Sequence, residues 1–285
     1  MARRKLAGLR ILVTGASQGI GRALVVSAAK RGAKVIAVAR SESLLAELVS
    51  EVRASGGTIE AVVGDITQSV DRERMIATAK ERFGGLDILI NNAGIGATGH
   101  FMDSDPQVLR TIFETNYFAL VEMTRLCLPL LKEGKTPAIV NISSVVGRRA
   151  LPARSLYSAS KFAVQGFSEA IRAELAKDGI DVIIINPGLT QTNFSKNMLE
   201  QKAKIQLDHL RGMTSEEVAE ATLTAVEKGK PEATFSLQGK LLLLVSRFAP
   251  WFVDWRARTT VRRLFAEEIA EREMRRKQRM DQVAR

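Results

Sequence analysis

The stretch Thr14-Gly-Ala-Ser-Gln-Gly-Ile-Gly21 decides the fold of this protein, because it joins the end of an apolar run to the start of an amphipathic one. We expect Gly15 to permit a tight turn. We expect Gly19 and Gly21 to let the backbone approach a pyrophosphate and to let the helix lie close to a sheet. A helix that begins here directs its N-terminus at those phosphates. The motif predicts a dinucleotide-binding unit, and the competing interpretation is an ordinary strand-to-helix turn.

The elements around this stretch alternate regularly between strands and helices. Strands are predicted for Val- and Ile-rich runs that are too short for an ordinary helix, at 11–14, 35–39, 59–63, 87–91, 138–142 and 182–185. Amphipathic helices are predicted at 19–32, 42–55, 69–83, 106–132 and 156–178, followed by a helix near 215–228 and a short strand near 232–236. This order predicts a parallel sheet covered on both faces. We therefore expect an α/β, doubly wound (Rossmann) fold, with residues 8–236 as one nucleotide-binding catalytic domain.

Composition excludes several kinds of site. The chain of 285 residues has one cysteine, Cys127, and two histidines, His100 and His209, so an intramolecular disulfide and a Cys/His metal cluster are both ruled out. No Ser-His-Asp triad is obvious, and we predict no metal site. The basic start, Met1-Ala-Arg-Arg-Lys, is not followed by a long apolar run, so no signal peptide is expected and the default setting is the cytoplasm.

The net charge of +11 suggests either a nucleic acid or an anionic membrane as a partner. The chain holds only two Trp and two Tyr, and no basic stretch is interleaved with aromatic residues. Proteins that bind single-stranded nucleic acids need such aromatic residues for stacking. We therefore expect no nucleic-acid partner.

Residues 237–285 form an extension whose composition differs from that of the domain. Its first part is apolar at 241–245 and 248–253, whereas 256–285 hold ten basic and five acidic residues. We predict at least two helices, broken at Pro250. Arg247 and Pro250 interrupt the apolar part before the ~20 residues that a membrane span needs. One hypothesis is peripheral membrane contact through 237–263, and the alternative is packing on the domain or in a dimer.

The residues that follow the second, third and fourth strands predict the cofactor. Arg40 stands where a site for NAD carries an acid, and its guanidinium can pair with a 2′-phosphate, so we predict NADP. The alternative for Arg40 is a solvated surface side chain. Asp65 can accept a hydrogen bond from an adenine amino group. Asn91, in Asn91-Asn-Ala-Gly94, belongs either to the site or to a structural link between strands.

The chemistry is predicted at the end of the fifth strand and in the helix that follows. Ser144 comes just after that strand, and Tyr157 and Lys161 lie one turn apart on one helix face. A lysine ammonium at that position favours a developing phenolate. Asn116, inside the long helix over 106–132, faces the same edge of the sheet if the predicted register holds.

These motifs, in this order and with these spacings, resemble the short-chain dehydrogenase/reductase family, in its TGxxxGxG and YxxxK branch, over about residues 8–236. The resemblance implies that Tyr157 is the general acid in reduction and the base in oxidation, and that Ser144 polarises the substrate carbonyl. It implies that Lys161 binds ribose hydroxyls and lowers the pKa of the tyrosine, and that Asn116 holds a water linking Lys161 to solvent. The predicted cofactor contacts are Gly15, Ser17, Gln18, Gly19, Ile20, Gly21, Arg40, Asp65, Ile66, Asn92, Ala93, Gly94, Tyr157, Lys161, Pro187, Gly188, Thr190 and Thr192.

The substrate pocket is predicted to lie between 146–156 and the loop after Thr192. Apolar residues recur in both segments, at Val146, Leu151, Leu156, Phe194, Met198, Ile205, Leu207 and Leu210. Arg148, Arg149 and Arg154 lie close in sequence, but none is clearly placed to grip a small carboxylate. We therefore predict a hydrophobic lipid, acyl or steroid-like carbonyl or alcohol.

The predicted activity is that of an NADP(H)-dependent oxidoreductase, and the alternative is a non-catalytic dinucleotide-binding scaffold or redox sensor. The extension departs from the soluble 3-oxoacyl-carrier-protein reductases of the family and looks like that of lipid- and steroid-handling members. A homo-oligomer is expected.

Overall fold

A computed structural model, which describes residues 4–194, 197–203 and 212–283, shows a seven-stranded parallel sheet. The strands stand in the order β3-β2-β1-β4-β5-β6-β9, and β7 pairs separately with β8. Their bounds are β1 Arg10–Thr14, β2 Lys34–Ala39, β3 Thr58–Val63, β4 Ile88–Asn91, β5 Ala138–Ile142, β6 Asp181–Asn186, β7 Thr190–Gln191, β8 Met213–Thr214 and β9 Glu232–Thr234. The predicted doubly wound fold is confirmed, and each predicted strand is present within a few residues.

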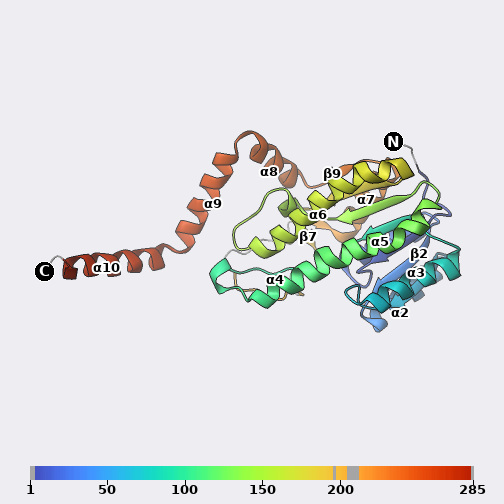
Figure 1. Ribbon diagram of the computed structural model, residues 1–285, viewed down its shortest axis with the longest axis horizontal. Helices are drawn as coiled ribbons and strands as arrows, with labels where there is room; N and C mark the ends of the chain where they lie inside the picture. Colours follow the sequence, from blue (N-terminus) through green and yellow to red (C-terminus); the bar gives the residue numbers. More distant parts are fainter. Residues whose placement is uncertain (1–3, 195–196, 204–211, 284–285) are drawn as a thin grey trace.

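Helices cover both faces of the sheet (Figure 1). In the domain they are α1 Gly19–Lys30, α2 Glu42–Ala54, α3 Ser69–Phe83, α4 Pro106–Phe113, α5 Ala119–Lys132, α6 Ser155–Glu174 and α7 Ser215–Glu227. Strand β1 shows why its run is apolar at every position. Ile11 and Val13 face the core cluster shared with α1, α2 and α7, whereas Leu12 faces the cluster shared with α3 and α5. A strand buried on both faces loses the polar alternation of a half-exposed one.

The strand order creates the crevice in which a ligand can bind. The chain moves outward from β1 through β2 to β3 and then returns to place β4 on the other side of β1. Crossovers on the two sides of β1 therefore diverge, which makes the carboxyl ends of β1 and β4 the switch point at which open α/β sheets have their ligand-binding crevice. The glycine-rich turn follows β1, and Asn92 follows β4, so the two predicted cofactor segments meet at this crevice.

The helix predicted over 106–132 is present but not uniform. A π-helical turn, η2 Glu114–Phe118, separates α4 from α5 without breaking the rod, and Asn116 lies inside it. One-turn π segments occur frequently at functional sites, because the extra residue redirects the side chains in the turn. The hydrophobic period in the sequence does not reveal this insertion.

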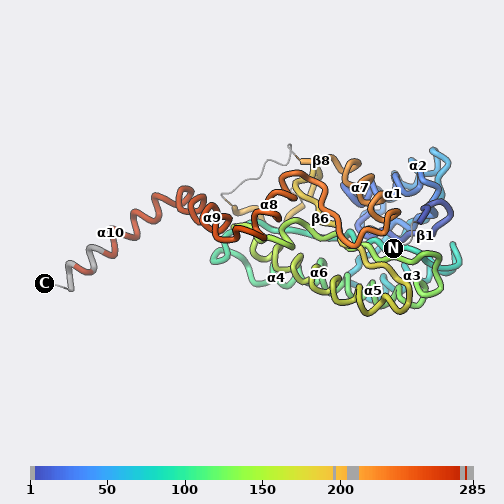
Figure 2. The backbone as a smooth tube through the Cα atoms, turned by 90° about the horizontal axis from the view of Figure 1, so that it is seen from above, coloured from blue at the N-terminus to red at the C-terminus, as the bar shows by residue number. Residues whose placement is uncertain are grey.

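The extension forms three helices, α8 Leu237–Phe248, α9 Pro250–Leu264 and α10 Ala266–Val283. The predicted break at Pro250 is confirmed, because Pro250 begins α9. A second break, at Phe265, was not predicted. Helices α8 and α9 lie at the end of the domain where α4 and α6 begin, and α10 extends away from it (Figures 1 and 2). Among the described residues, no helix is both long enough and apolar enough to cross a membrane.

Candidate active site

The glycine-rich turn is held tightly against the end of β4. Gly15 has a φ of +67°, and a Cβ there would lie 2.8 Å from the Cα of Ala93. The Asn92 side-chain amide donates to the carbonyl oxygens of Thr14 (2.9 Å) and Gly15 (3.2 Å). A Cβ at Gly21 would lie 2.1 Å from the Gly15 carbonyl oxygen. Gly21 is therefore required for the turn to pack on the first turn of α1, in line with the close packing of the helix that was predicted for it.

The N-terminus of α1 suits an anionic group. No side chain caps the helix at Gln18, no acid lies in its first turn, and Gly19 begins it with a φ of +54°. Helix N-termini present backbone N–H groups and a positive dipole end, which bind phosphates. Ser17 is half-buried in this turn, and Ile20 packs partly buried against the core. The residues here therefore fit the dinucleotide that the turn predicts.

The side of the crevice next to β2 and β3 carries Arg40 and Asp65. The Arg40 side chain is 75% exposed, and its nearest charged partner is the Asp65 carboxylate, 3.9 Å away. The other Asp65 oxygen accepts from the backbone N–H and the hydroxyl of Thr67, both at 2.9 Å. Ile66 is buried in the core below them. The Arg40 guanidinium is thus held loosely enough to meet a phosphate at this edge.

Asn91, for which two roles were open, links neighbouring elements. Its side-chain amide donates to the hydroxyl of Thr124 (3.1 Å) and to Oδ1 of Asn141 (2.9 Å), and all three residues are buried. The Asn141 amide donates in turn to the hydroxyl of Ser168 at 2.8 Å. This chain of hydrogen bonds ties β4 and β5 to α5 and α6. The structure thereby gives Asn91 the role of a link between strands.

Lys161, Asn116 and Gly94 converge at the ends of β4 and β5. The Lys161 ammonium donates to the carbonyl oxygen of Ile142 at 2.9 Å, and its Nζ lies 5.8 Å from the Tyr157 ring centroid. A Cβ at Gly94 would lie 3.2 Å from Oδ1 of Asn116 and 3.5 Å from Nζ of Lys161. The predicted pairing of Tyr157 with Lys161 on one face of α6 is therefore realised, and Gly94 leaves room beside it.

Asn116 is tied to two segments of the site. Its Oδ1 accepts from the backbone N–H of Ile95 at 2.8 Å, and its amide donates to the Ile95 carbonyl (2.9 Å) and to the Ser160 hydroxyl (3.0 Å). The π-helical turn directs Asn116 inward, where the residue is fully buried. Asn116 thus anchors the loop after β4 to the helix that carries Tyr157.

Ser144 lies between the strand end and the tyrosine. Its hydroxyl accepts from the backbone N–H of Val146 (3.3 Å), donates to the carbonyl of Pro187 (3.5 Å), and is a hydrogen-bond partner of Tyr157. A short 3-10 turn, η3 Val145–Gly147, begins immediately after it. Ser144 and Tyr157 are therefore placed so that one carbonyl oxygen can receive a hydrogen bond from both.

Burial sets the proton affinities of the two titratable groups. It raises the pKa of Tyr157 to about 12, whereas the positive charge of Arg154 and the hydrogen bond with Ser144 act to lower this pKa. Burial also lowers the pKa of Lys161 to about 8. The expectation that Lys161 lowers the pKa of Tyr157 is not met by the chain alone. Loss of hydration raises this pKa more than nearby positive charge lowers it, and the positive charge that lowers it comes from Arg154. From the sequence, Arg154 was considered only as a ligand for a small carboxylate, although it stands three residues before Tyr157 at the start of α6.

The segment over 187–192 crosses from β6 toward the N-terminus of α1. The Pro187 carbonyl accepts from the backbone N–H of Val145 at 3.0 Å, and the Thr190 hydroxyl donates to the Gly188 carbonyl at 3.3 Å. The Thr192 hydroxyl accepts from the backbone N–H of Phe194 at 3.1 Å. A Cβ at Gly19 would lie 3.2 Å from the Thr192 methyl. The structure therefore brings this segment and the glycine-rich turn together.

Apolar side chains line the rim of the site. The ring centroids of Phe194 and Tyr157 are 5.6 Å apart, and a Cβ at Gly96 would lie 2.9 Å from the Phe194 ring. The Gly99 N–H donates to the Ala153 carbonyl at 3.0 Å, which joins the loop after β4 to the loop before α6. Met198 also reaches Gly96. Three other residues predicted for the pocket, Ile205, Leu207 and Leu210, lie outside the described residues.

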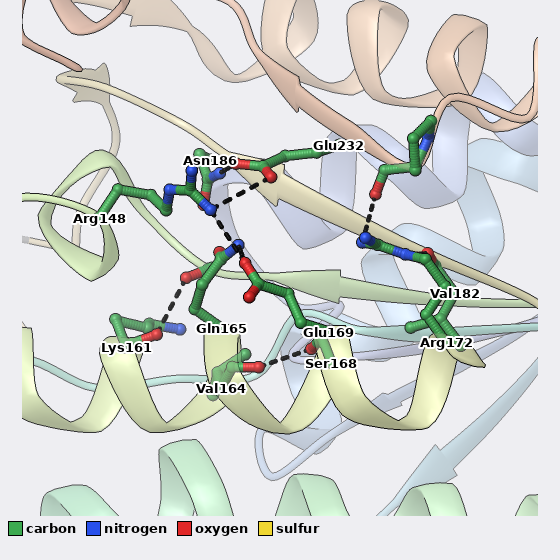
Figure 3. Close-up of polar contacts among 12 residues, drawn as sticks. Arg148, Lys161, Val164, Gln165, Ser168, Glu169, Arg172, Val182, Asn186 and Glu232 are labelled. Atoms are coloured by element: carbon green, nitrogen blue, oxygen red, sulfur yellow. Dashed lines mark hydrogen bonds and ion pairs between the residues drawn. The ribbon is translucent and has the colours of Figure 1, made fainter. Parts of the chain in front are cut away.

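Arg148 holds several of these segments in place. Its guanidinium lies 2.9 Å from the Glu169 carboxylate on α6 and 3.4 Å from the Glu232 carboxylate on β9 (Figure 3). The same two carboxylates accept from the amides of Gln165 and Asn186, each at 2.7 Å (Figure 3). Arg148 thus joins η3 to α6 and to β9, and Glu232 continues the link to Asn186 at the end of β6. This network engages Arg148 within the protein, consistent with the view that it does not bind a small carboxylate.

Lys161 is expected to make the stability of the ligand-free protein depend on pH. Burial lowers the pKa of its ammonium from the usual 10.5 to about 8, so the unfolded chain holds this proton more strongly than the folded one. Lys161 alone should therefore raise the free energy of unfolding by about 2 kcal/mol as the pH increases from about 8 to about 10, and this gain is lost as the pH falls again. The raised pKa values of buried Cys127 and Tyr157 act in the opposite direction over part of this range, so the contribution of Lys161 is measured as a difference between variants. Urea denaturation across this pH range measures the slope. Lys161→Met should lower the slope relative to the wild type by the Lys161 contribution, and Lys132→Met should retain the wild-type slope; equal slopes in all three proteins would contradict the prediction.

The chain is similar to known proteins over most of its length. Residues 10–203 match the family model described as short chain dehydrogenase. The ketoacyl reductase HetN of Nostoc sp. is 34% identical over 258 residues, which cover 87% of this chain and 88% of that protein. Dehydrogenase/reductase SDR family member 7B of Xenopus tropicalis is 35% identical over 232 residues, which cover 78% and 75% of the two chains.

A similar solved structure supports the fold. The crystal structure of a short chain dehydrogenase/reductase from Burkholderia phymatum in complex with NAD matches with a TM-score of 0.80. Its sequence is 22% identical, and the match covers 87% of this chain and 96% of that one.

Proposed function

Because this chain belongs to the short-chain dehydrogenase/reductase family of oxidoreductases, we propose that it uses NADP(H) to interconvert a hydrophobic ketone or aldehyde and the corresponding alcohol. One observation carries the proposal. The tyrosine, lysine, serine and asparagine of the predicted catalytic set gather at the carboxyl ends of β4 and β5, and the neighbouring strand β1 leads into the uncapped N-terminus of α1. NADPH supplies the hydride when bound, and the chain's own residues supply the proton and the orientation.

In this proposal, Tyr157 gives a proton to the substrate oxygen in reduction and takes one in oxidation. With a pKa of about 12, its phenol is fully protonated near neutral pH and is ready to donate. Reduction of a carbonyl develops negative charge on oxygen, which donors already in place stabilise best. The Ser144 hydroxyl is the second donor to that oxygen. To act as a base in oxidation, the phenol must be deprotonated near neutral pH, so nearby positive charge has to lower its pKa by several units. Each unit corresponds to about 1.4 kcal/mol of stabilisation of the phenolate.

Lys161 and Asn116 are proposed to support the phenol. A lysine ammonium carries three N–H donors, and the Ile142 carbonyl engages one of them. Another can bind ribose hydroxyls and hold positive charge near Tyr157. Asn116 positions the loop over 94–95 against α6 and is proposed to hold a water that links Lys161 to solvent.

The preference for NADP and for an apolar substrate rests on side chains at the two ends of the crevice. Arg40 offers an exposed guanidinium where a 2′-phosphate is expected, with Asp65 beside it. At the catalytic end, Val146 is buried, and Phe194 packs near Tyr157. We further propose a cytoplasmic homo-oligomer that contacts membranes peripherally through 237–263.

A substrate screen tests the proposed activity. Consumption of NADPH and of NADH is followed with ketones of graded chain length, and the reverse reaction with the matching alcohols. Turnover should favour NADPH and should improve with chain length. Tight NADPH binding without turnover on any member of the panel would instead favour the dinucleotide-binding scaffold or redox sensor.

A further inference from the structure

Helix α8 presents an apolar face that the described part of the chain leaves exposed. Four of its residues recur at intervals of four, three and four positions, so they share one helix face. They are Leu237 (81% exposed), Leu241 (58%), Leu244 (56%) and Phe248 (75%). The opposite side packs on the domain, because Gly239 is buried and a Cβ there would lie 2.8 Å from a Val145 methyl. A helix that carries apolar residues on both sides is normally buried on both sides, so the exposed apolar side of α8 is expected to contact a partner.

Helix α9 continues this surface and changes its character along its length. Trp251 and Trp255 are 70% and 54% exposed and lie one turn apart. Arg258 and Arg262 follow at the spacing that keeps them on the same face. The face therefore passes from aromatic to basic within one helix. Tryptophan is enriched where hydrocarbon meets the polar headgroups of a bilayer.

The charge of this surface favours an anionic partner over a second copy of the chain. Residues 237–264 hold six basic residues and one acidic residue. That acid, Asp254, forms an ion pair with Arg149 of the domain. A symmetric dimer through this face would bring two arginine-rich helices together, and like charges that face each other are destabilising. A surface of anionic headgroups attracts the same arginines.

Three contacts fix α8 and α9 to the rim of the active site. Gly239 of α8 packs on Val145, which directly follows Ser144. Asp254 of α9 pairs with Arg149 of the loop that leads to Tyr157. Phe265, at the end of α9, meets the His100 ring edge-on at a centroid distance of 4.5 Å. These contacts join the two helices to the loop after β5 and to the loop after β4, which lie on two sides of the site. Figure 1 shows α8 and α9 at the end of the domain where α4 and α6 begin.

The rim beside this contact is apolar as well. Phe101 and Met102, in the 3-10 turn η1 Phe101–Asp103 that follows His100, are 72% and 93% exposed. Large exposed apolar side chains that lie close together mark interaction surfaces.

We infer that the exposed faces of α8 and α9 dock the enzyme on an anionic lipid bilayer, with the entrance of the active site turned toward it. The docking face consists of Leu237, Leu241, Leu244, Phe248, Trp251, Trp255, Arg258 and Arg262. The substrate class that follows is a carbonyl or alcohol dissolved in the bilayer, and this part of the inference rests on the proposed oxidoreductase function. In this arrangement α8 and α9 lie on the surface of the bilayer and do not cross it, because both helices lie beside the domain.

The chain carries its own reporter for this contact. Its two tryptophans, Trp251 and Trp255, both lie in the docking face. Tryptophan emission of the full-length protein is recorded with vesicles of phosphatidylcholine alone and of equimolar phosphatidylcholine and phosphatidylserine. We expect a blue shift with the anionic vesicles at low salt, quenching when the acyl chains are brominated, and a weaker effect as salt rises.

Two double variants separate the charge of the face from its apolar area. Arg258→Gln/Arg262→Gln should weaken binding to anionic vesicles about 25-fold, since each basic residue near such a surface contributes roughly 5-fold. Arg82→Gln/Arg125→Gln is the matched control, because both side chains are exposed and lie outside the docking face. Leu241→Gln/Leu244→Gln should weaken binding and keeps both tryptophans as reporters.

Two results would overturn the inference. One is tryptophan emission that ignores anionic vesicles at low salt. The other is a wild-type dimer in analytical ultracentrifugation that Leu241→Gln/Leu244→Gln converts to monomer, with no vesicle binding by either protein. Turnover of a short water-soluble ketone by Arg258→Gln/Arg262→Gln should equal that of the wild type. Vesicle binding without turnover would count against the proposed function and leave the docking surface standing.

Discussion

Replacing Tyr157 by phenylalanine should lower kcat by at least about 100-fold while NADPH binding stays close to that of the wild type. Phenylalanine keeps the ring that packs 5.6 Å from Phe194 but lacks the hydroxyl that donates the proton. General acid–base catalysis by a positioned side chain typically contributes about 10²- to 10⁴-fold, and this range sets the expected loss. Steady-state turnover of a ketone and a fluorescence titration with NADPH measure the two quantities separately.

The only other tyrosine of the chain provides the matched control. Tyr117 lies in the π-helical turn, where its ring contacts Phe113, Phe118 and Phe167. Tyr117→Phe removes the same oxygen atom outside the proposed proton path and keeps the ring contacts, so kcat should stay within about 2-fold, a barrier change below ~0.5 kcal/mol. Near-normal turnover by Tyr157→Phe would remove the tyrosine from its proposed role.

Replacing Arg40 by aspartate should shift the cofactor preference from NADPH toward NADH by roughly 10- to 150-fold. The change removes a cation that can pair with the 2′-phosphate and introduces an acceptor for ribose hydroxyls. A hydrogen bond to a charged group contributes about 1.5 to 3 kcal/mol, which corresponds to that range. The ratio of kcat/KM for the two cofactors, measured with one substrate, is the readout.

The carboxylate of Asp65 complicates this substitution, so a second variant is needed. Asp65 lies 3.9 Å from the Arg40 guanidinium, and a new aspartate would face it with like charge. Arg40→Gln removes the cation without adding an acid, and it should weaken NADPH alone. An unchanged ratio in both variants would make Arg40 a solvated surface residue, which was the alternative from sequence.

The fold was predictable because the signals for it are local. Strand β1 and its neighbours are buried on both faces, so their sequences are continuously apolar and short. The glycine-rich turn identifies the first strand–helix unit, because Gly15 has a positive φ and Gly21 has no space for a side chain. Pro250 likewise marks a helix start through its own ring. These constraints act within a few residues and can be read from a single chain.

The site was predictable only in part. The spacing of Tyr157 and Lys161 predicted that the two side chains lie next to each other on one helix face, and the structure places them together. The pKa of Tyr157 could not be predicted, because it depends on how much water the fold removes and on a charge from Arg154. Asn116 was expected in a regular helix, but the π-helical turn sets its direction.

By itself, the sequence determined the order of strands and helices, the glycine-rich turn at the crevice and the identity of the residues that gather there. Local periodicity and turn chemistry specify these features. The tertiary structure alone decided that Asn91 binds Thr124 and Asn141, and that the extension returns to the rim of the site. Asp254 and Arg149 stand 105 residues apart in the chain, and their ion pair exists only because helix packing brings α9 to that loop. Contacts of this kind depend on how whole elements pack, and no pattern within either segment encodes its distant partner.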